Sequence, residues 1–130
     1  MRYLGIDYGT KQIGVAVSDQ SGSFAFPRDT IQNDKNALVI LIRIIALEEI
    51  EEVIVGDTRS LDGGANQITP EADAFVLKLS QSIKVPIHRS REAFSSQEAA
   101  RFAPPGKKHD DSSAAAIILQ RFLDAKSKSE

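Results

Sequence analysis

The chain of 130 residues contains no cysteine. Disulfide bonds, thiolate zinc sites and a cysteine nucleophile are therefore excluded. No apolar run reaches the length needed to cross a bilayer, and no basic segment followed by a secretory apolar stretch precedes the first apolar run. We therefore expect a cytoplasmic protein without a membrane partner.

An excess of positive charge is also missing. Lysine and arginine number 16 against 18 acidic residues, which gives a formal net charge of −2 and a pI near 5.7. A nucleic-acid surface would therefore have to be a local basic patch. Since 42% of residues are hydrophobic and 26% are charged, the composition is that of a globular protein. We expect one domain over residues 1–125 and a disordered tail over residues 126–130.

Residues 3–19 are the most informative stretch. A short apolar run over residues 3–6 is typical of a strand buried on both faces, and it ends in Asp7. A carboxylate at the rim of a core is costly unless it has a partner. Gly9 permits a tight reversal, and alternating apolar residues from Ile13 to Val17 predict a return strand. Taken alone, this segment fits a solvated aspartate in a hairpin turn equally well.

The remaining pattern predicts further strands alternating with helices, and hence a mixed sheet with helices packed on it. Pro27 marks the third strand as an edge strand or a strand with a break. The predicted elements are a strand over 23–31, a helix over 37–50, a strand over 53–56, a loop over 57–69, a helix over 70–83, a strand over 85–88, and helices over 95–102 and 110–125 separated by a loop over 103–109.

Two aspartates stand at the start of the last predicted helix. The residues three, four and seven positions after Asp111 are two alanines and an isoleucine, an apolar face that must lie on the sheet. The same count from Asp110 gives a more polar flank, so we predict that Asp110 caps the helix and Asp111 points inward. Asp7 and Asp111 could then share a divalent cation such as Mg²⁺, which prefers carboxylate oxygens.

A third candidate segment follows the last predicted strand. Glu92 could bring another carboxylate, while Arg89 and Arg91 could contact phosphate. Ser95 and Glu98 have the spacing of a capping box, so the segment fits a polar loop and a helix cap as well.

Several motifs together resemble one known family. They are LGIDYGTKQIGVAVSD, the G-x-x-A-x-P spacing at Gly22, Ala25 and Pro27, VIVG at 53–56, LDGG at 61–64 and DSSAAAIILQRFLD at 111–124. The chain resembles the YqgF-type Holliday junction resolvases, also described as pre-16S rRNA processing nucleases, essentially from end to end. The resemblance implies an α/β, RNase H-like fold: a five-stranded mixed sheet with its first three strands antiparallel and helices on both faces.

The resemblance also implies catalytic and metal-binding roles for Asp7, Glu92 and Asp111, with Mg²⁺ or Mn²⁺ as cofactor. Glu92 departs from the family in its flanks, because Arg91 stands where the family has aspartate and Ala93 where it has arginine. Asp57-Thr58-Arg59 also departs, standing where the family usually has Leu-Pro, and Asp57 is the alternate candidate for a metal ligand. We expect Asp7, Glu92 and Asp111 to converge at one end of the sheet.

The mechanism that follows is metal-dependent phosphodiester hydrolysis. Two metal ions about 4 Å apart would activate a water and stabilise the leaving oxygen. Lys11, Arg89 and Arg91 are the predicted substrate-binding residues. The predicted partner is an RNA precursor or branched DNA, and the sequence leaves open which of them is cut and whether cleavage is endo- or exonucleolytic.

Two other functions remain open from the sequence. Asp7-Tyr8-Gly9-Thr10 fits the phosphate loop of actin-like and Hsp70-like nucleotide-binding lobes, although such proteins need a second lobe. The altered flanks of Glu92 fit a non-catalytic nucleic-acid-binding or protein-binding module on the same fold. A homodimer is also predicted, because residues 37–47 contain Arg43 as their single charged side chain and leave little polar surface for solvent.

Overall fold

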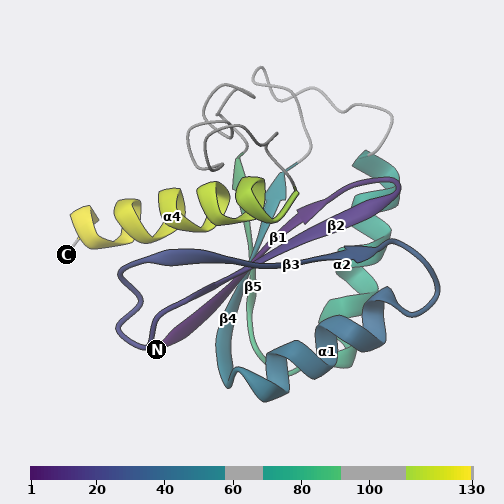
Figure 1. Ribbon diagram of the computed structural model, residues 1–130, viewed down its shortest axis with the longest axis horizontal. Helices are drawn as coiled ribbons and strands as arrows, with labels where there is room; N and C mark the ends of the chain where they lie inside the picture. Colours follow the sequence, from purple (N-terminus) through teal and green to yellow (C-terminus); the bar gives the residue numbers. More distant parts are fainter. Residues whose placement is uncertain (58–68, 92–110, 130) are drawn as a thin grey trace.

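The computed structural model describes residues 1–57, 69–91 and 111–129. Their strands form one mixed sheet in the order β3-β2-β1-β4-β5 (Figure 1). The strands are β1 (Arg2–Tyr8), β2 (Gln12–Ser18), β3 (Ala25–Gln32), β4 (Ile50–Asp57) and β5 (Ile87–Arg91). The β1–β2 and β2–β3 pairs are antiparallel, whereas β4 runs parallel to β1 and to β5. The predicted five-stranded mixed sheet with three antiparallel leading strands is confirmed.

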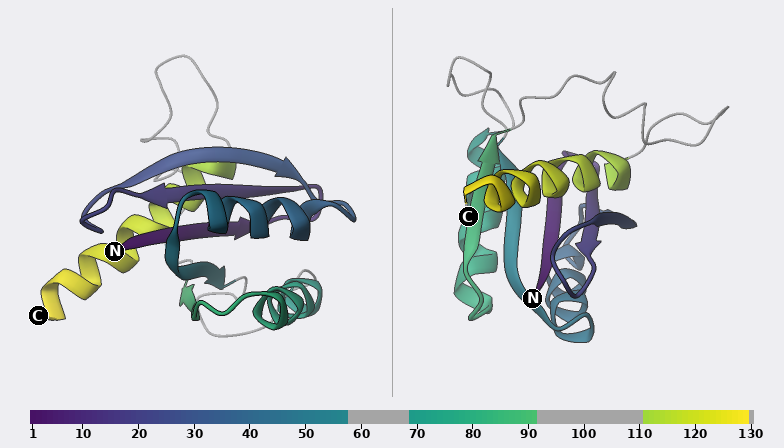
Figure 2. Two further views of the ribbon diagram at one scale, coloured as in Figure 1. Left: turned by 90° about the horizontal axis from the view of Figure 1, so that it is seen from below. Right: turned by 90° about the vertical axis from the view of Figure 1, so that its left-hand side faces the viewer.

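Helices cover both faces of this sheet, as predicted (Figure 2). Helices α1 (Ala37–Leu47) and α2 (Thr69–Ser82) lie on one face, and α4 (Asp111–Ser129) crosses the other. Side chains along β1 point alternately to the two faces of the sheet, so this strand contributes to both cores. Leu4 and Ile6 pack towards α1 and α2, while Tyr3 packs towards α4.

Helix α1 ends three residues earlier than the sequence pattern predicts. After Leu47, the Glu48 N–H donates to the Ile44 carbonyl at 2.9 Å and the Glu49 N–H to the Ala46 carbonyl at 3.3 Å. Glu49 has φ 53°, a left-handed conformation that cannot continue the helix. The chain then enters β4 at residue 50 instead of residue 53.

Strand β3 is the edge strand with a break that Pro27 predicts. Ala16 of β2 faces Pro27 and Val15 faces Asp29, so Arg28 is the extra residue of a β-bulge. Proline is tolerated here because a residue at an edge or a bulge can do without the N–H that an interior strand needs for its ladder.

Two boundaries at the carboxyl end also differ from prediction. Strand β5 begins at Ile87 rather than at residue 85, and α4 continues through Ser129 instead of ending at residue 125. Lys126 is therefore helical and donates to the Tyr3 hydroxyl, although the sequence predicts a disordered tail from that position. The predicted loop after β4, the helix over 95–102 and the loop over 103–109 fall wholly or largely outside the described residues.

No helix in the described ranges is long and apolar enough to cross a membrane.

The outward face of α1 retains some apolar surface. Leu41, Ile44 and Ile45 are buried against the sheet, whereas Val39 is 49% exposed and Leu47 is 74% exposed. Arg43 lies between these two exposed residues along the helix and is itself exposed. The outward face of α1 thus carries both apolar and charged side chains, and the homodimer stays a prediction.

Glu49→Gly is expected to raise the free energy of unfolding by about 0.5–1 kcal/mol, because glycine adopts positive φ without steric cost. Urea denaturation measures the change. Glu48→Gly is the matched control: Glu48 has φ −88° and its carboxylate lies 3.5 Å from Arg2, so this variant should be destabilised. Equal effects at both positions would refute the role assigned to Glu49.

Self-association through α1 predicts that Val39→Glu or Leu47→Glu shifts the chain from dimer to monomer at micromolar concentration. Both side chains are exposed, so the substitutions should leave the unfolding midpoint nearly unchanged. Sedimentation velocity measures the mass. A wild-type chain that sediments as a monomer would remove the idea.

Candidate active site

Asp7 lies near the carboxyl end of β1, on the face of the sheet that α4 covers. Tyr3 and Gly5 of the same strand contact α4, and Asp7 continues this alternating set. Its side chain is half-buried. The strand ends of β1, β4 and β5 point in one direction because these strands are parallel, so Asp7 lies at the sheet end where all three finish.

Helix α4 runs antiparallel to β1 and brings its first residue towards this end. Near the start of β1, the Tyr3 ring lies 6.0 Å from that of Phe122. Two residues further along β1, Gly5 lies against Ala115 and Leu119, which are earlier in the helix. Continuing this direction leads from Gly5 to Asp7 on the strand and from Ala115 to Asp111, the first residue of the helix.

The helix can lie this close because residue 5 has no side chain. A Cβ at Gly5 would stand 2.8 Å from the Leu119 Cβ and 2.9 Å from the Ala115 carbonyl oxygen. Both contacts are with atoms that cannot rotate away, so any larger residue would push the helix outward.

Two hydrogen bonds from the Gln120 side chain hold α4 in position along its axis. The Gln120 Oε1 accepts from the Ala25 N–H at 2.8 Å, and its Nε2 donates to the Ser23 carbonyl at 3.0 Å. Sequence reasoning missed this residue, because its partners lie more than 90 positions away and no local motif marks the contact.

The turn after Asp7 is fixed in a similar way. The Asn33 side chain donates to the Gly9 carbonyl at 2.7 Å, and the Asn33 N–H donates to the Lys11 carbonyl at 2.9 Å. A Cβ at Gly9 would lie 2.4 Å from the Gln12 carbonyl oxygen, which explains the glycine. Lys11 is exposed on this turn, at the sheet end that carries Asp7.

Tyr8 connects the end of β1 to α2, on the face of the sheet opposite α4. Its hydroxyl donates to the Glu71 carboxylate at 2.7 Å, and its ring lies 5.2 Å from that of Phe75 in α2. Burial raises the pKa of the Tyr8 phenol above its ordinary value, and the nearby Glu71 carboxylate raises that pKa further, against a lowering contribution from Asn33. Tyr8 therefore stays protonated and keeps donating.

Arg89 lies on the other side of the sheet from Asp7. Its guanidinium pairs with Asp73 of α2 at 2.9 Å, while the preceding residue, His88, stacks on Phe122 of α4 at 5.6 Å between ring centroids. The alternation of β5 thus directs Arg89 towards α2, and the structure does not bring this predicted substrate-binding residue to Asp7.

Several other predicted residues are placed only in part. The backbones of Asp57, Arg91 and Asp111 belong to β4, β5 and α4 respectively, but their side chains lie outside the described structure. Glu92 and Asp110 lie outside the described residues altogether. Within the residues that are described, no three histidine, aspartate or glutamate side chains form a group able to hold a metal ion.

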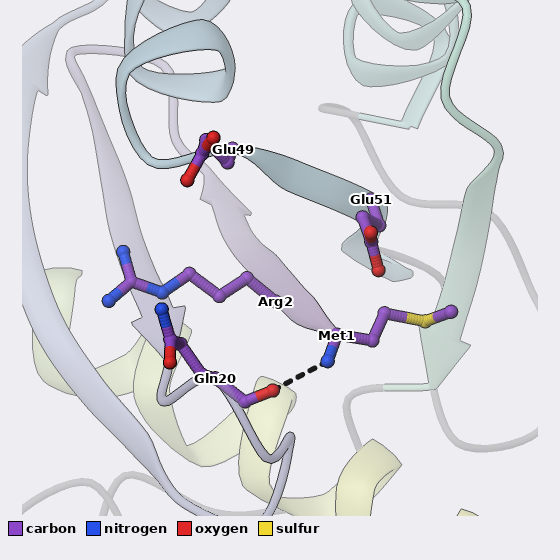
Figure 3. Close-up of a pocket in the computed structure, with 5 residues that line it drawn as sticks. All are labelled: Met1, Arg2, Gln20, Glu49 and Glu51. Atoms are coloured by element: carbon purple, nitrogen blue, oxygen red, sulfur yellow. Dashed lines mark hydrogen bonds between the residues drawn. The ribbon is translucent and has the colours of Figure 1, made fainter.

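A cavity of about 410 Å³ lies elsewhere, at the amino end of β1 (Figure 3). It is lined by Met1, Arg2, Gln20, Glu49 and Glu51. Its charges are mixed, and the Met1 amino group is already bonded to the Gln20 carbonyl at 2.5 Å. This cavity lies at the opposite end of β1 from Asp7 and takes no part in the candidate site.

Comparison with known proteins decides the family. A model of RuvX, described as Holliday junction resolvase, matches residues 1–125. The chain belongs to this family. Two relatives bear the name "putative pre-16S rRNA nuclease". The one from Lawsonia intracellularis is 36% identical over 95% of this chain and 94% of its own length. The one from Chlorobaculum tepidum is 38% identical over 97% of this chain and 95% of its own length.

Solved structures agree on the fold of this RuvX-family chain. Thermus thermophilus RuvC in complex with a Holliday junction substrate aligns with a TM-score of 0.66 and 16% identity, covering 98% of this chain and 96% of that one. The Fowlpox virus resolvase bound to junction DNA aligns at 0.61 with 12% identity, covering 97% and 99%. The RNase H-like fold and the nuclease family that the sequence motifs imply are therefore confirmed.

Gly5→Ala should lower the free energy of unfolding by about 1–3 kcal/mol, because the new methyl group must displace α4. If α4 also carries part of the active site, nuclease activity should fall further than the loss of folded protein explains. Denaturation and cleavage assays at a temperature where the variant is fully folded separate the two effects.

Ile44→Val is the control for Gly5→Ala. Ile44 is buried on α1, on the face of the sheet opposite α4, so the smaller side chain costs stability without disturbing α4 or the candidate site. It should cost stability but leave the activity of the folded fraction unchanged. Equal activity of both folded variants would contradict the importance of the close contact at Gly5.

Proposed function

We propose that this RuvX-family chain is a metal-dependent nuclease that hydrolyses phosphodiester bonds in structured nucleic acid. Its site would consist of Asp7, Glu92 and Asp111 at the carboxyl ends of the parallel strands. The observation that carries the proposal is the antiparallel placement of α4 on β1, which directs the helix start towards the sheet end that holds Asp7.

The donor chemistry fits Mg²⁺ or Mn²⁺. Carboxylate oxygens are the ligands that such hard cations prefer, and the half-buried carboxylate of Asp7 at a strand end is suited to hold one. When bound, the cation would supply Lewis-acid stabilisation of the charge that develops on phosphate oxygens.

Glu92 is favoured over Asp57 as the third carboxylate. In β4, Val53 and Val55 pack towards α1 and α2, and position 57 continues their alternating set. This register disfavours Asp57, so the proposal keeps Glu92, the residue that the family resemblance implies.

Lys11 is the favoured phosphate contact among the three predicted basic residues. It is exposed on the turn that follows Asp7, whereas Arg89 pairs with Asp73 across the sheet. A lysine in this position would orient the substrate backbone without reading its sequence.

The substrates we propose are pre-16S rRNA at its 5′ end and Holliday junctions. The names of the relatives favour the first, and the description of the family favours the second. Both are intracellular nucleic acids, so the proposal places the chain in the cytoplasm.

Asp7→Asn should reduce Mg²⁺- or Mn²⁺-dependent cleavage of these substrates by more than about 100-fold, since even outer-shell partners of metal ligands are worth about 10- to 100-fold. Asp34→Asn is the matched control. It makes the same charge change at an exposed position, and an asparagine oxygen there can still accept the Asn36 N–H that Asp34 Oδ1 accepts at 2.8 Å. Gel-based cleavage of RNA precursor and junction DNA, run in parallel, measures both variants.

Two results would contradict the nuclease. Metal-independent binding of nucleic acid without cleavage by the wild type would favour a non-catalytic module on the same fold. Binding of ATP that Asp7→Asn abolishes would favour a nucleotide-binding lobe.

A further inference from the structure

Two phenylalanines are exposed on neighbouring positions of the sheet edge. Phe24 is 62% exposed and Phe26 is 53% exposed. Other aromatic rings in the described ranges pack against one another, as Tyr8 does with Phe75. An exposed pair of large flat rings is unusual for a surface that serves no binding role.

Both rings belong to the same face of the strand. Phe26 lies opposite Val17 of β2, whose side chain packs towards the core beneath α1 and α2. The Asp19 N–H donates to the Phe24 carbonyl at 3.1 Å, so the pairing of Val17 with Phe26 continues two residues further to Asp19 and Phe24. Phe24 therefore belongs to the same face as Phe26. The rings therefore start from positions roughly 7 Å apart along one edge.

The turn that presents Phe24 is held rigid. Asp19 accepts from the Ser23 N–H at 2.9 Å and from the Phe24 N–H at 3.1 Å, while the Ser21 hydroxyl donates to its other oxygen at 2.7 Å. The Ser21 hydrogen bond, followed by those backbone bonds, holds the pKa of Asp19 below its ordinary range. Phe24 is thus preorganised, so a ligand would not have to order the turn.

The edge beside these rings is closed to another strand. Pro27 has no N–H to offer, Arg28 forms the bulge, and the Thr30 N–H is taken by the Asp29 carboxylate at 2.8 Å. Such features prevent edge-to-edge pairing with a second copy of the chain. A ligand that uses ring faces rather than backbone hydrogen bonds fits this surface better.

We propose that Phe24 and Phe26 form a stacking platform for unpaired bases of a single-stranded nucleic-acid segment. Base faces stack on aromatic rings without regard to sequence, and Arg28, which is exposed two residues after Phe26, adds a cation to the same edge strand. This proposal deepens the proposed nuclease function and rests on it for the class of ligand.

The platform lies on the opposite face of the sheet from Asp7, and one extended substrate would have to reach both around the β3 edge. Phe26 lies two strands away from β1, and the position on β1 that matches it, Leu4, is three residues before Asp7. Phe26 and Asp7 are therefore roughly 14 Å apart as measured within the sheet. A single-stranded segment next to the cleaved bond would pass around the edge of β3 to reach the rings.

The test measures binding of a labelled single strand of about 12 nucleotides by the full chain, using fluorescence anisotropy without divalent cations. Phe24→Ala and Phe26→Ala should each weaken this binding by about 5- to 100-fold, while affinity for a blunt duplex stays unchanged. Leu77→Ala, at a 58% exposed position on α2, is the matched control and should change neither affinity.

A second variant reports the contact itself. The chain contains no tryptophan, so Phe26→Trp introduces a single indole. This variant should retain single-strand affinity, and its indole emission should be quenched when the strand is added. Full affinity in the Phe24→Ala, Phe26→Ala double variant, or an indole emission that the strand leaves unchanged, would overturn the platform.

The remaining outcomes separate this proposal from the nuclease. Cleavage that persists while both rings prove dispensable for single-strand binding overturns the platform alone. Ring-dependent binding by a chain that cleaves nothing supports the platform and rejects the nuclease. Sedimentation as a dimer that the double variant dissociates, with single-strand affinity unchanged, would assign the rings to a second copy instead.

Discussion

The structure depends on the close contact between α4 and β1 at Gly5. With no side chain there, the helix backbone approaches the strand to a distance that even a methyl group would prevent. This contact fixes how α4 lies on the sheet, and therefore where its first turn points. The proposed active site would be assembled by this helix–strand packing, since Asp7 and Asp111 are separated by most of the chain.

Polar contacts at the other end of the helix maintain the same alignment. Lys126 donates to the Tyr3 hydroxyl and lies 3.8 Å from the Glu52 carboxylate, which is also 3.4 Å from His88. Gln120 adds its two bonds to the backbone between these regions. Because α4 is held at the Gly5 contact, at Gln120 and at Lys126, it cannot slide or rotate freely on the sheet. This suits a site that needs two carboxylates at a fixed separation.

Sequence patterns are informative where local physics decides the outcome. The apolar run ending in Asp7, the reversal at Gly9 and the disrupted edge at Pro27 follow from residue type alone, and the structure has them. The helix over 37–50 is predicted too long because nothing in its composition marks Glu49 as left-handed. Arg89 is predicted as a substrate contact, and its pairing with Asp73 could not be read from the sequence, because Asp73 lies on a separate helix.

The central claim is that the carboxylates of Asp7 and Asp111 hold one divalent cation. Anomalous X-ray diffraction from crystals of the full chain soaked in Mn²⁺ tests it most directly. The account predicts a manganese peak coordinated by both carboxylates, with Glu92 as a further ligand. A peak elsewhere, or an Asp111 carboxylate turned away from Asp7 while Asp110 faces it, would contradict the account.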